Sequence, residues 1–183
     1  MQFICEAYTD GGPVAILRYE HRFLWDGNED YFHVINQPRN GCLQVLDGFK
    51  NTCPLCIYHQ ESDGNFHVYA DRGAFLVIGE ISADEGFEIR HCLPSVTQAI
   101  RGKPVILDSF GGKIIVFDAA IPGSAIGLRK AGCAQVQFGT KARSFRYDAA
   151  LIDVDTGNWE ALELYCKEDH LSFSGVVFRL VSQ

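Results

Sequence analysis

The chain lacks the features that mark several common classes of protein. No apolar run approaches the ~20 residues that a membrane-spanning helix needs, so we expect no membrane partner. The N-terminus, Met1 to Glu6, has neither the basic start nor the small-residue cleavage site of a signal peptide, and we expect a cytoplasmic protein. No repeat, low-complexity tract or linker rich in Pro, Gly or Ser divides the 183 residues, which predicts a single domain, residues 1–183.

Basic residues are scarce. The chain has 16 Lys and Arg against 23 Asp and Glu, and its net charge of −7 argues against a phosphate-backbone ligand. Lys141, Arg143 and Arg146 form only a small cluster, without aromatics on the same face. We therefore expect no nucleic-acid partner. The excess of acidic residues favours a partner with a basic surface.

Recognisable catalytic motifs are also missing. No Gly-x-Ser-x-Gly occurs, and the serine nearest to that pattern, Ser124, is followed two positions later by Ile126 instead of glycine. The segment from Asp153 begins like a calcium loop, but Asn158 and Leu164 hold the positions of its glycine and its bidentate glutamate, so a hairpin turn is favoured. The sequence predicts no catalytic residue, no cofactor and no enzyme activity.

Seven cysteines are spread without the spacing of a disulfide framework, and most lie in hydrophobic segments. Cys53 and Cys56 form a single Cys-x-x-Cys, which could bind a metal ion or exchange a disulfide. A zinc site would need His59 and Cys92 to complete it, and no second Cys-x-x-Cys is present. Ordinary semi-buried thiols are the favoured interpretation. The alternative is a small zinc- or thiol-dependent enzyme that uses Cys53 and Cys56 with His59 or Cys92.

Alternating apolar residues dominate the chain from residue 54 onward and predict antiparallel strands. Phe66, Val68 and Ala70 are expected to face inward. The turn signals predict two hairpins, then a strand through Ala149 and Leu151, a turn at 155–158 and two further strands. The hairpins join Leu55–Gln60 to Phe66–Ala70 and Phe75–Ile81 to Phe87–Leu93.

Two short helices complete the expected fold. Asn28 can cap a helix with the apolar face Tyr31, Phe32 and Ile35, ended by Pro38. Ser95 can cap a second helix through Ile100, with Gly102 in the left-handed position after it and Pro104 beyond. The predicted class is α+β, predominantly an antiparallel β meander or sheet with two short helices.

The densest acidic cluster beside an aromatic residue lies near the first helix. It contains Trp25, Asp26, Glu29 and Asp30, followed by Tyr31. Tryptophan is a frequent interface anchor, and carboxylates suit a basic partner. These five residues are the predicted partner-binding patch, although Asp30 and Tyr31 could equally cap and pack the helix.

The segment from Gly111 to Gly123 joins an apolar strand to a Pro-Gly turn. Asp118 has no second carboxylate, metal ligand or nucleophile in local register. Its expected role is to accept backbone hydrogen bonds where the chain leaves the sheet.

Four segments together resemble the immunity protein 21 family of bacterial polymorphic toxin systems. They are Thr9-Asp10-Gly11-Gly12-Pro13, Trp25-Asp26-Gly27, Asp30-Tyr31 and the run from Gly112 to Gly123 that includes Phe117-Asp118-Ala119-Ala120-Ile121-Pro122-Gly123. Their order and approximate spacing match that family, whereas residues 36–104 carry no matching motif.

The resemblance implies a single immunity-protein-like domain that binds a cognate toxin in the producing cell without covalent chemistry. It also implies that the shared residues form a family motif, which we interpret as structural. These residues are Gly11, Gly12, Pro13, Gly112, Phe117, Asp118, Ala119, Pro122 and Gly123.

Overall fold

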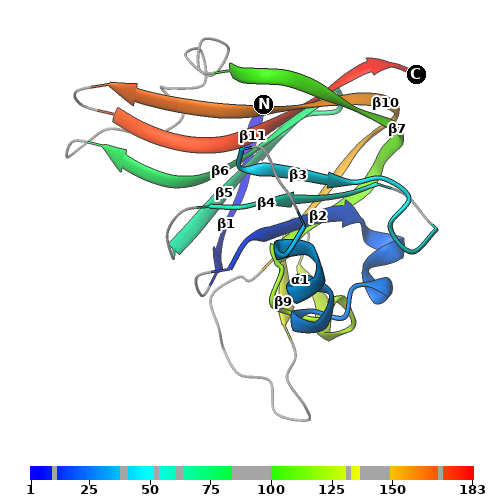
Figure 1. Ribbon diagram of the computed structural model, residues 1–183. Helices are drawn as coiled ribbons and strands as arrows, with labels where there is room; N and C mark the ends of the chain where they lie inside the picture. The colour runs from blue at the N-terminus through cyan, green and yellow to red at the C-terminus, as the bar shows by residue number, and fades with distance from the viewer. Residues whose placement is uncertain are drawn as a thin grey trace.

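The protein is built on one antiparallel β-sheet (Figure 1). The computed structural model describes residues 1–9, 12–37, 41–51, 54–60, 64–83, 100–130, 133–136, 149–168 and 171–183. In these residues the strands are β1 (Gln2–Thr9), β2 (Val14–Arg18), β3 (Leu43–Leu46), β4 (Leu55–Tyr58), β5 (Gly64–Ala70), β6 (Ala74–Ala83), β7 (Ile100–Asp118), β8 (Ile126–Lys130), β9 (Cys133–Val136), β10 (Ala149–Glu168) and β11 (Leu171–Ser182). Their order is β1-β5-β6-β11-β10-β7-β2-β4-β3, with β9 also paired to β10 and β8 to β9.

The predicted antiparallel sheet is confirmed, but the fold is mostly β rather than a balanced α+β. Its described helical elements are the α-helix α1 (Asn28–Ile35) and the 3-10 turns η1 (Tyr19–Leu24), η2 (Phe49–Asn51) and η5 (Gly123–Ala125). The second predicted helix begins outside the described residues. Its expected end is wrong, because Ile100 and Gly102 belong to β7. Gly102 does have a positive φ of 73°, but it lies beside a register irregularity between β7 and β10.

The first predicted hairpin is also wrong. β4 pairs with β2 and β3, whereas β5 pairs with β1 and β6. A turn signal shows where a strand ends, but the choice of partner depends on which apolar faces can be buried together. The partner strand expected for the second hairpin, 87–93, lies outside the described residues.

No turn interrupts β10 at 155–158, so that prediction is wrong as well. The strand continues through these residues with register shifts on either side of Gly157. Opposite them, Gly111 and Gly112 have φ values of 98° and 78°, which glycine adopts without a steric penalty. The irregularity changes the side-chain alternation, and Val154 and Trp159 consequently face the same core although they are five positions apart.

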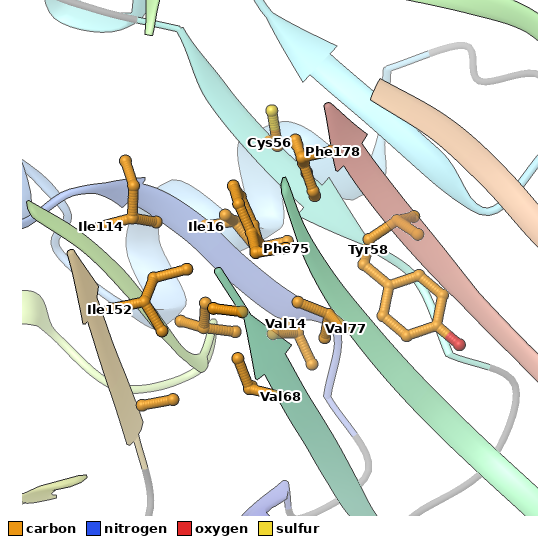
Figure 2. Packing of buried hydrophobic residues seen from close by; sticks show 14 of the residues in the cluster. Val14, Ile16, Cys56, Tyr58, Val68, Phe75, Val77, Ile114, Ile152 and Phe178 are labelled. Atoms are coloured by element: carbon orange, nitrogen blue, oxygen red, sulfur yellow. The ribbon is translucent and has the colours of Figure 1, made fainter. Parts of the chain in front are cut away.

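The main core lies on the concave face of the curved sheet. Residues from both ends of the strand order meet there, and Figure 2 shows Ile16 close to Phe75 and Cys56 close to Phe178. The rings of Phe75 and Phe178 stack with centroids 4.3 Å apart, and Trp159 lies 5.7 Å from Phe75. Phe66, Val68 and Ala70 are all buried in this core, as the alternation predicts.

A second core lies on the opposite face of β2, β4 and β7. Leu17, Ile57 and Phe117 belong to it, and Trp25 and Val34 cover them from the segment that includes η1 and α1. α1 begins at Asn28 but is capped by Gly27, with φ of 64°, and not by the Asn28 side chain. Its buried residue is Val34. Phe32, predicted to lie on the apolar face, is 59% exposed, which corrects that assignment.

Candidate functional site

The segments that carry the family resemblance converge in space. The Ala119 N–H donates to the Pro13 carbonyl at 2.8 Å, and the Trp25 indole Nε1–H donates to the Ala119 carbonyl at 2.8 Å, across 94 residues of chain. The Gly123 N–H donates to the Trp25 carbonyl at 2.9 Å. These bonds join the start of β2, the segment after η1 and the end of β7 into one unit, which we call the motif cluster.

Glycines allow the backbones of the motif cluster to approach closely. A Cβ on Gly27 would lie 2.7 Å from the Pro122 nitrogen, and a Cβ on Gly123 would overlap the Arg22 carbonyl oxygen. Asp118 is buried, and its Oδ1 accepts a hydrogen bond from the Ala120 N–H at 2.8 Å. A Cβ on Gly12 would lie 2.9 Å from that same oxygen. Close packing and the Asp118 hydrogen bond within the cluster therefore explain the three glycines and the aspartate.

Two further motif residues, Phe117 and Gly112, lie at the edge of this unit or beyond it. Phe117 is fully buried in the second core, and Gly112 pairs with Val154 in the sheet. Gly11 lies outside the described residues.

Trp25 is not a surface residue. Its side chain is completely buried, packs 5.8 Å from the Phe49 ring between centroids, and donates its indole N–H within the motif cluster. The prediction of Trp25 as a direct partner contact is therefore corrected: it is a core residue. A tryptophan with a buried backbone partner for its N–H reaches this state without leaving a polar group unsatisfied.

The acidic residues near Trp25 are partly neutralised inside the protein. The Lys50 ammonium lies 3.0 Å from Asp26 Oδ2 and 2.8 Å from Asp30 Oδ2, and it also donates to the Leu24 carbonyl. Asp30 Oδ2 accepts a further hydrogen bond from the Asp26 N–H at 2.7 Å. Asp30 therefore fixes the start of α1, while Glu29 and the more exposed Asp26 present negative charge to solvent.

Lys50→Met tests this network. Burial alone would lower the pKa of Lys50, but its hydrogen bonds and charge interactions with Asp30 and Asp26 outweigh burial and raise it. A raised pKa stabilises the fold below the ordinary lysine value of about 10.4, and this stabilisation is lost as the pH rises through the folded-state pKa. Because Lys50 and Asp26 are exposed to solvent, which screens their interaction, we expect a loss of no more than about 1 kcal/mol in Lys50→Met near pH 8.

The unfolding free energies of the wild type and Lys50→Met, measured in urea, should therefore converge at a pH well above the ordinary lysine pKa, where Lys50 loses its proton. The matched control is Lys103→Met, which removes an exposed lysine without an ion pair in the described part of the chain. If the difference in unfolding free energy between the wild type and Lys50→Met were the same at pH 8 and at the high pH, the charge interactions of Lys50 would not stabilise the fold.

Four exposed side chains of the segment that includes η1 and α1 remain available, and we call them the aromatic–acidic surface: Phe23, Asp26, Glu29 and Phe32. Phe23 and Phe32 are 57% and 59% exposed. Lys50 connects the end of η1, which carries Phe23, to the first turn of α1, which precedes Phe32. Arg22 stacks its guanidinium 3.7 Å from the ring centroid of Phe23.

The sequence-based prediction missed both phenylalanines as surface residues. For Phe32 a signal was present, because Tyr31, Val34 and Ile35 have the spacing of one helix face and Phe32 falls outside it. Tyr31, the last residue of the predicted patch, is half-buried against the second core. The centroid of its ring lies 5.7 Å from that of the Phe32 ring. For Phe23 no sequence pattern distinguishes an exposed ring from a buried one.

Of the four residues named for the zinc or thiol alternative, Cys56 and His59 lie in the described part of the chain. Cys56 is completely buried among aliphatic and aromatic residues of the main core (Figure 2). His59 Nε2 lies 3.0 Å from Gln44 Oε1, whose amide donates to the Val34 carbonyl. Cys53 and Cys92 lie outside the described residues. Within those residues, no group of three or more His, Cys, Asp or Glu side chains is placed to hold a metal ion.

Comparison with known proteins adds no relative. No family model, curated protein or solved structure matches this chain. Among the described residues, no helix has the length and apolar character needed to span a membrane. The motif cluster and the aromatic–acidic surface are therefore the observations on which a functional proposal rests.

Proposed function

We propose that this chain is a non-catalytic immunity protein that binds and neutralises a cognate bacterial toxin in the cytoplasm of the producing cell. The convergence of the resembling segments in the motif cluster supports this proposal most strongly. Segments that matched by chance would have no reason to meet, whereas Pro13, Trp25 and Ala119 share consecutive hydrogen bonds. If the shared motif is kept because the fold needs it, its residues should form one structural unit, as the motif cluster does.

The aromatic–acidic surface supplies the contact face in this proposal. Exposed aromatic residues are the most frequent energetic anchors of protein interfaces, and Phe23 and Phe32 are available for that role. Asp26 and Glu29 add negative charge, which together with the net charge of −7 accelerates association with a basic surface. Trp25 acts indirectly, because it holds the backbone from which this surface projects.

Growth protection tests the proposal. The proposal expects a toxin domain to be encoded beside this chain, and that domain is expressed from an inducible promoter, with and without the chain. We expect growth to be restored by the wild type and lost with Phe23→Asp/Phe32→Asp, while Val181→Asp, which changes an equally exposed residue near the C-terminus, still protects. Absence of protection by the wild type at matched expression would contradict the function.

A further inference from the structure

A cleft of about 680 Å³ lies where the main core ends. One wall is made by the ends of β7, β10 and β11, and a second wall by the residues before β3 and after β4. The volume lies within the range of about 300–1,000 Å³ that is usual for small-molecule sites. None of the residues of the aromatic–acidic surface lines this cleft.

The strand wall of the cleft is a continuous polar patch. In the register of the sheet, Arg101 on β7 lies directly opposite Glu163 on β10, and Tyr165 on β10 lies directly opposite Ser174 on β11. Side chains of directly opposite residues share one face of a sheet, and so do those of residues two positions apart in a strand. The four side chains therefore lie together on the concave face, next to Ala161 of the main core.

The apolar residues of this wall do not turn toward the cleft. Leu164 and Phe173 are buried with Leu162 and Val177 in a cluster on the opposite face of the sheet. Tyr165, which is 46% exposed, is therefore the aromatic side chain that the strand wall presents to the cleft.

The second wall brings another polar group beside Glu163. A Cβ on Gly41 would overlap the Glu163 carboxylate, so the start of this segment lies against β10. The His59 N–H donates to the Cys42 carbonyl at 2.7 Å, which continues the pairing of β3 with β4 and places Gln60 opposite Gly41. Gln60 Oε1 is buried and accepts no hydrogen bond from the described residues.

The cleft offers both hydrogen-bond donors and acceptors. Glu163 Oε1 accepts a hydrogen bond from the Leu43 N–H at 2.9 Å, whereas no described residue donates to its Oε2. Gln60 Oε1 is a second acceptor without a donor. The Arg101 guanidinium and the Tyr165 hydroxyl are donors, and neither has a hydrogen-bond or ion-pair partner in the described part of the chain.

A neutral ligand with several hydroxyl groups fits this set of groups. Because Arg101 and Glu163 carry opposite charges at directly paired positions, the cleft favours neither an anion nor a cation. A carboxylate only accepts hydrogen bonds and an ammonium only donates them, whereas a hydroxyl does both. Neighbouring hydroxyls of one ligand can therefore donate to Glu163 and accept from Arg101.

We propose that this cleft binds a neutral sugar. Arg101 and Glu163 bind neighbouring hydroxyls of the sugar ring, and Gln60 Oε1 accepts a hydrogen bond from a further hydroxyl. The Tyr165 ring packs against the C–H groups on one face of the sugar. Sugar binding is independent of toxin binding, because it uses none of the residues in the aromatic–acidic surface.

An NMR titration of the full chain with D-glucose, D-galactose, D-mannose and N-acetyl-D-glucosamine tests the proposal. With at least one of these sugars, we expect saturable shifts of the backbone amides of residues 101, 163–165 and 174. Tetrahydropyran, which is the sugar ring without hydroxyls, should bind at least about tenfold more weakly. Because the sugars are neutral, their dissociation constants should change by less than about twofold between low and high salt.

Two variants test the residues that contact the sugar. Arg101→Met removes the donors and Tyr165→Ala removes the ring, and each should weaken binding by at least about tenfold. Lys103→Met is the matched control, since it removes an exposed cation that does not line the cleft, and it should bind as the wild type does. Arg101 and Tyr165 are exposed, so an unchanged melting temperature is expected for both variants.

Four results would overturn the proposal. They are no saturable shift at the cleft residues with any of the sugars, equal affinity for tetrahydropyran, an affinity that falls with salt as it does for an ionic ligand, and equal binding by Arg101→Met and Lys103→Met.

Discussion

Gly123→Ala should destabilise the protein by at least about 3 kcal/mol, near the upper end of overpacking effects. The added Cβ would overlap the Arg22 carbonyl oxygen, which is backbone and cannot rotate away. The shift needed to relieve this overlap would strain the hydrogen bond between the Gly123 N–H and the Trp25 carbonyl. The measurement is the free energy of unfolding in urea.

Gly73→Ala is the control for this prediction. A Cβ on Gly73 would meet no atom within 4 Å, and its φ lies outside the left-handed region. We expect the control to change stability by less than about 1 kcal/mol. Similar losses in the two variants would show that close backbone approach in the motif cluster does not explain Gly123.

Phe23→Asp/Phe32→Asp should weaken toxin binding by at least about 100-fold, because each substitution removes an aromatic anchor and hot-spot residues contribute about 2 kcal/mol or more. The melting temperature should change little, since both rings are more than half exposed in the unbound protein. Titration calorimetry with the toxin domain measures the affinity, and thermal unfolding measures the stability of the same samples.

Val181→Asp is the matched control, because Val181 is 59% exposed but lies near the end of β11. Its affinity for the toxin should remain within about threefold of the wild type. If the double variant bound as tightly as this control, the contact face would have to lie elsewhere on the molecule.

Local patterns predicted local structure well in this chain. The alternation at Phe66, Val68 and Ala70 predicts a strand with that inward face, and the structure has both. The acidic first turn of α1 predicts a helix start within one residue of the observed one. In both cases the interactions that determine the local structure join residues only a few positions apart in the chain.

The errors concern choices that depend on distant residues. Asp155 to Asn158 have the composition of a turn, but Gly111 and Gly112 on the neighbouring strand accommodate a bulge that lets β10 continue. Likewise, β4 pairs with β2 and β3 and not with β5, and the two faces of β2 and β4 contribute to both cores.

The candidate site was predicted only in part, because it too depends on residues that are distant in the chain. The sequence places Asp26, Glu29 and Asp30 together, but it does not show that Lys50 pairs with two of them. It also does not show that Trp25 points inward to Ala119 while Phe32 points outward. Both outcomes depend on contacts between segments that are far apart in the chain.

Titration calorimetry of the wild-type chain against the purified toxin domain encoded beside it tests the central claim most directly. We predict a 1:1 complex with a dissociation constant of about 10 nM or tighter, and loss of toxin activity at the same stoichiometry. The absence of binding heat at several temperatures, together with full toxin activity in excess chain, would contradict the proposed immunity function.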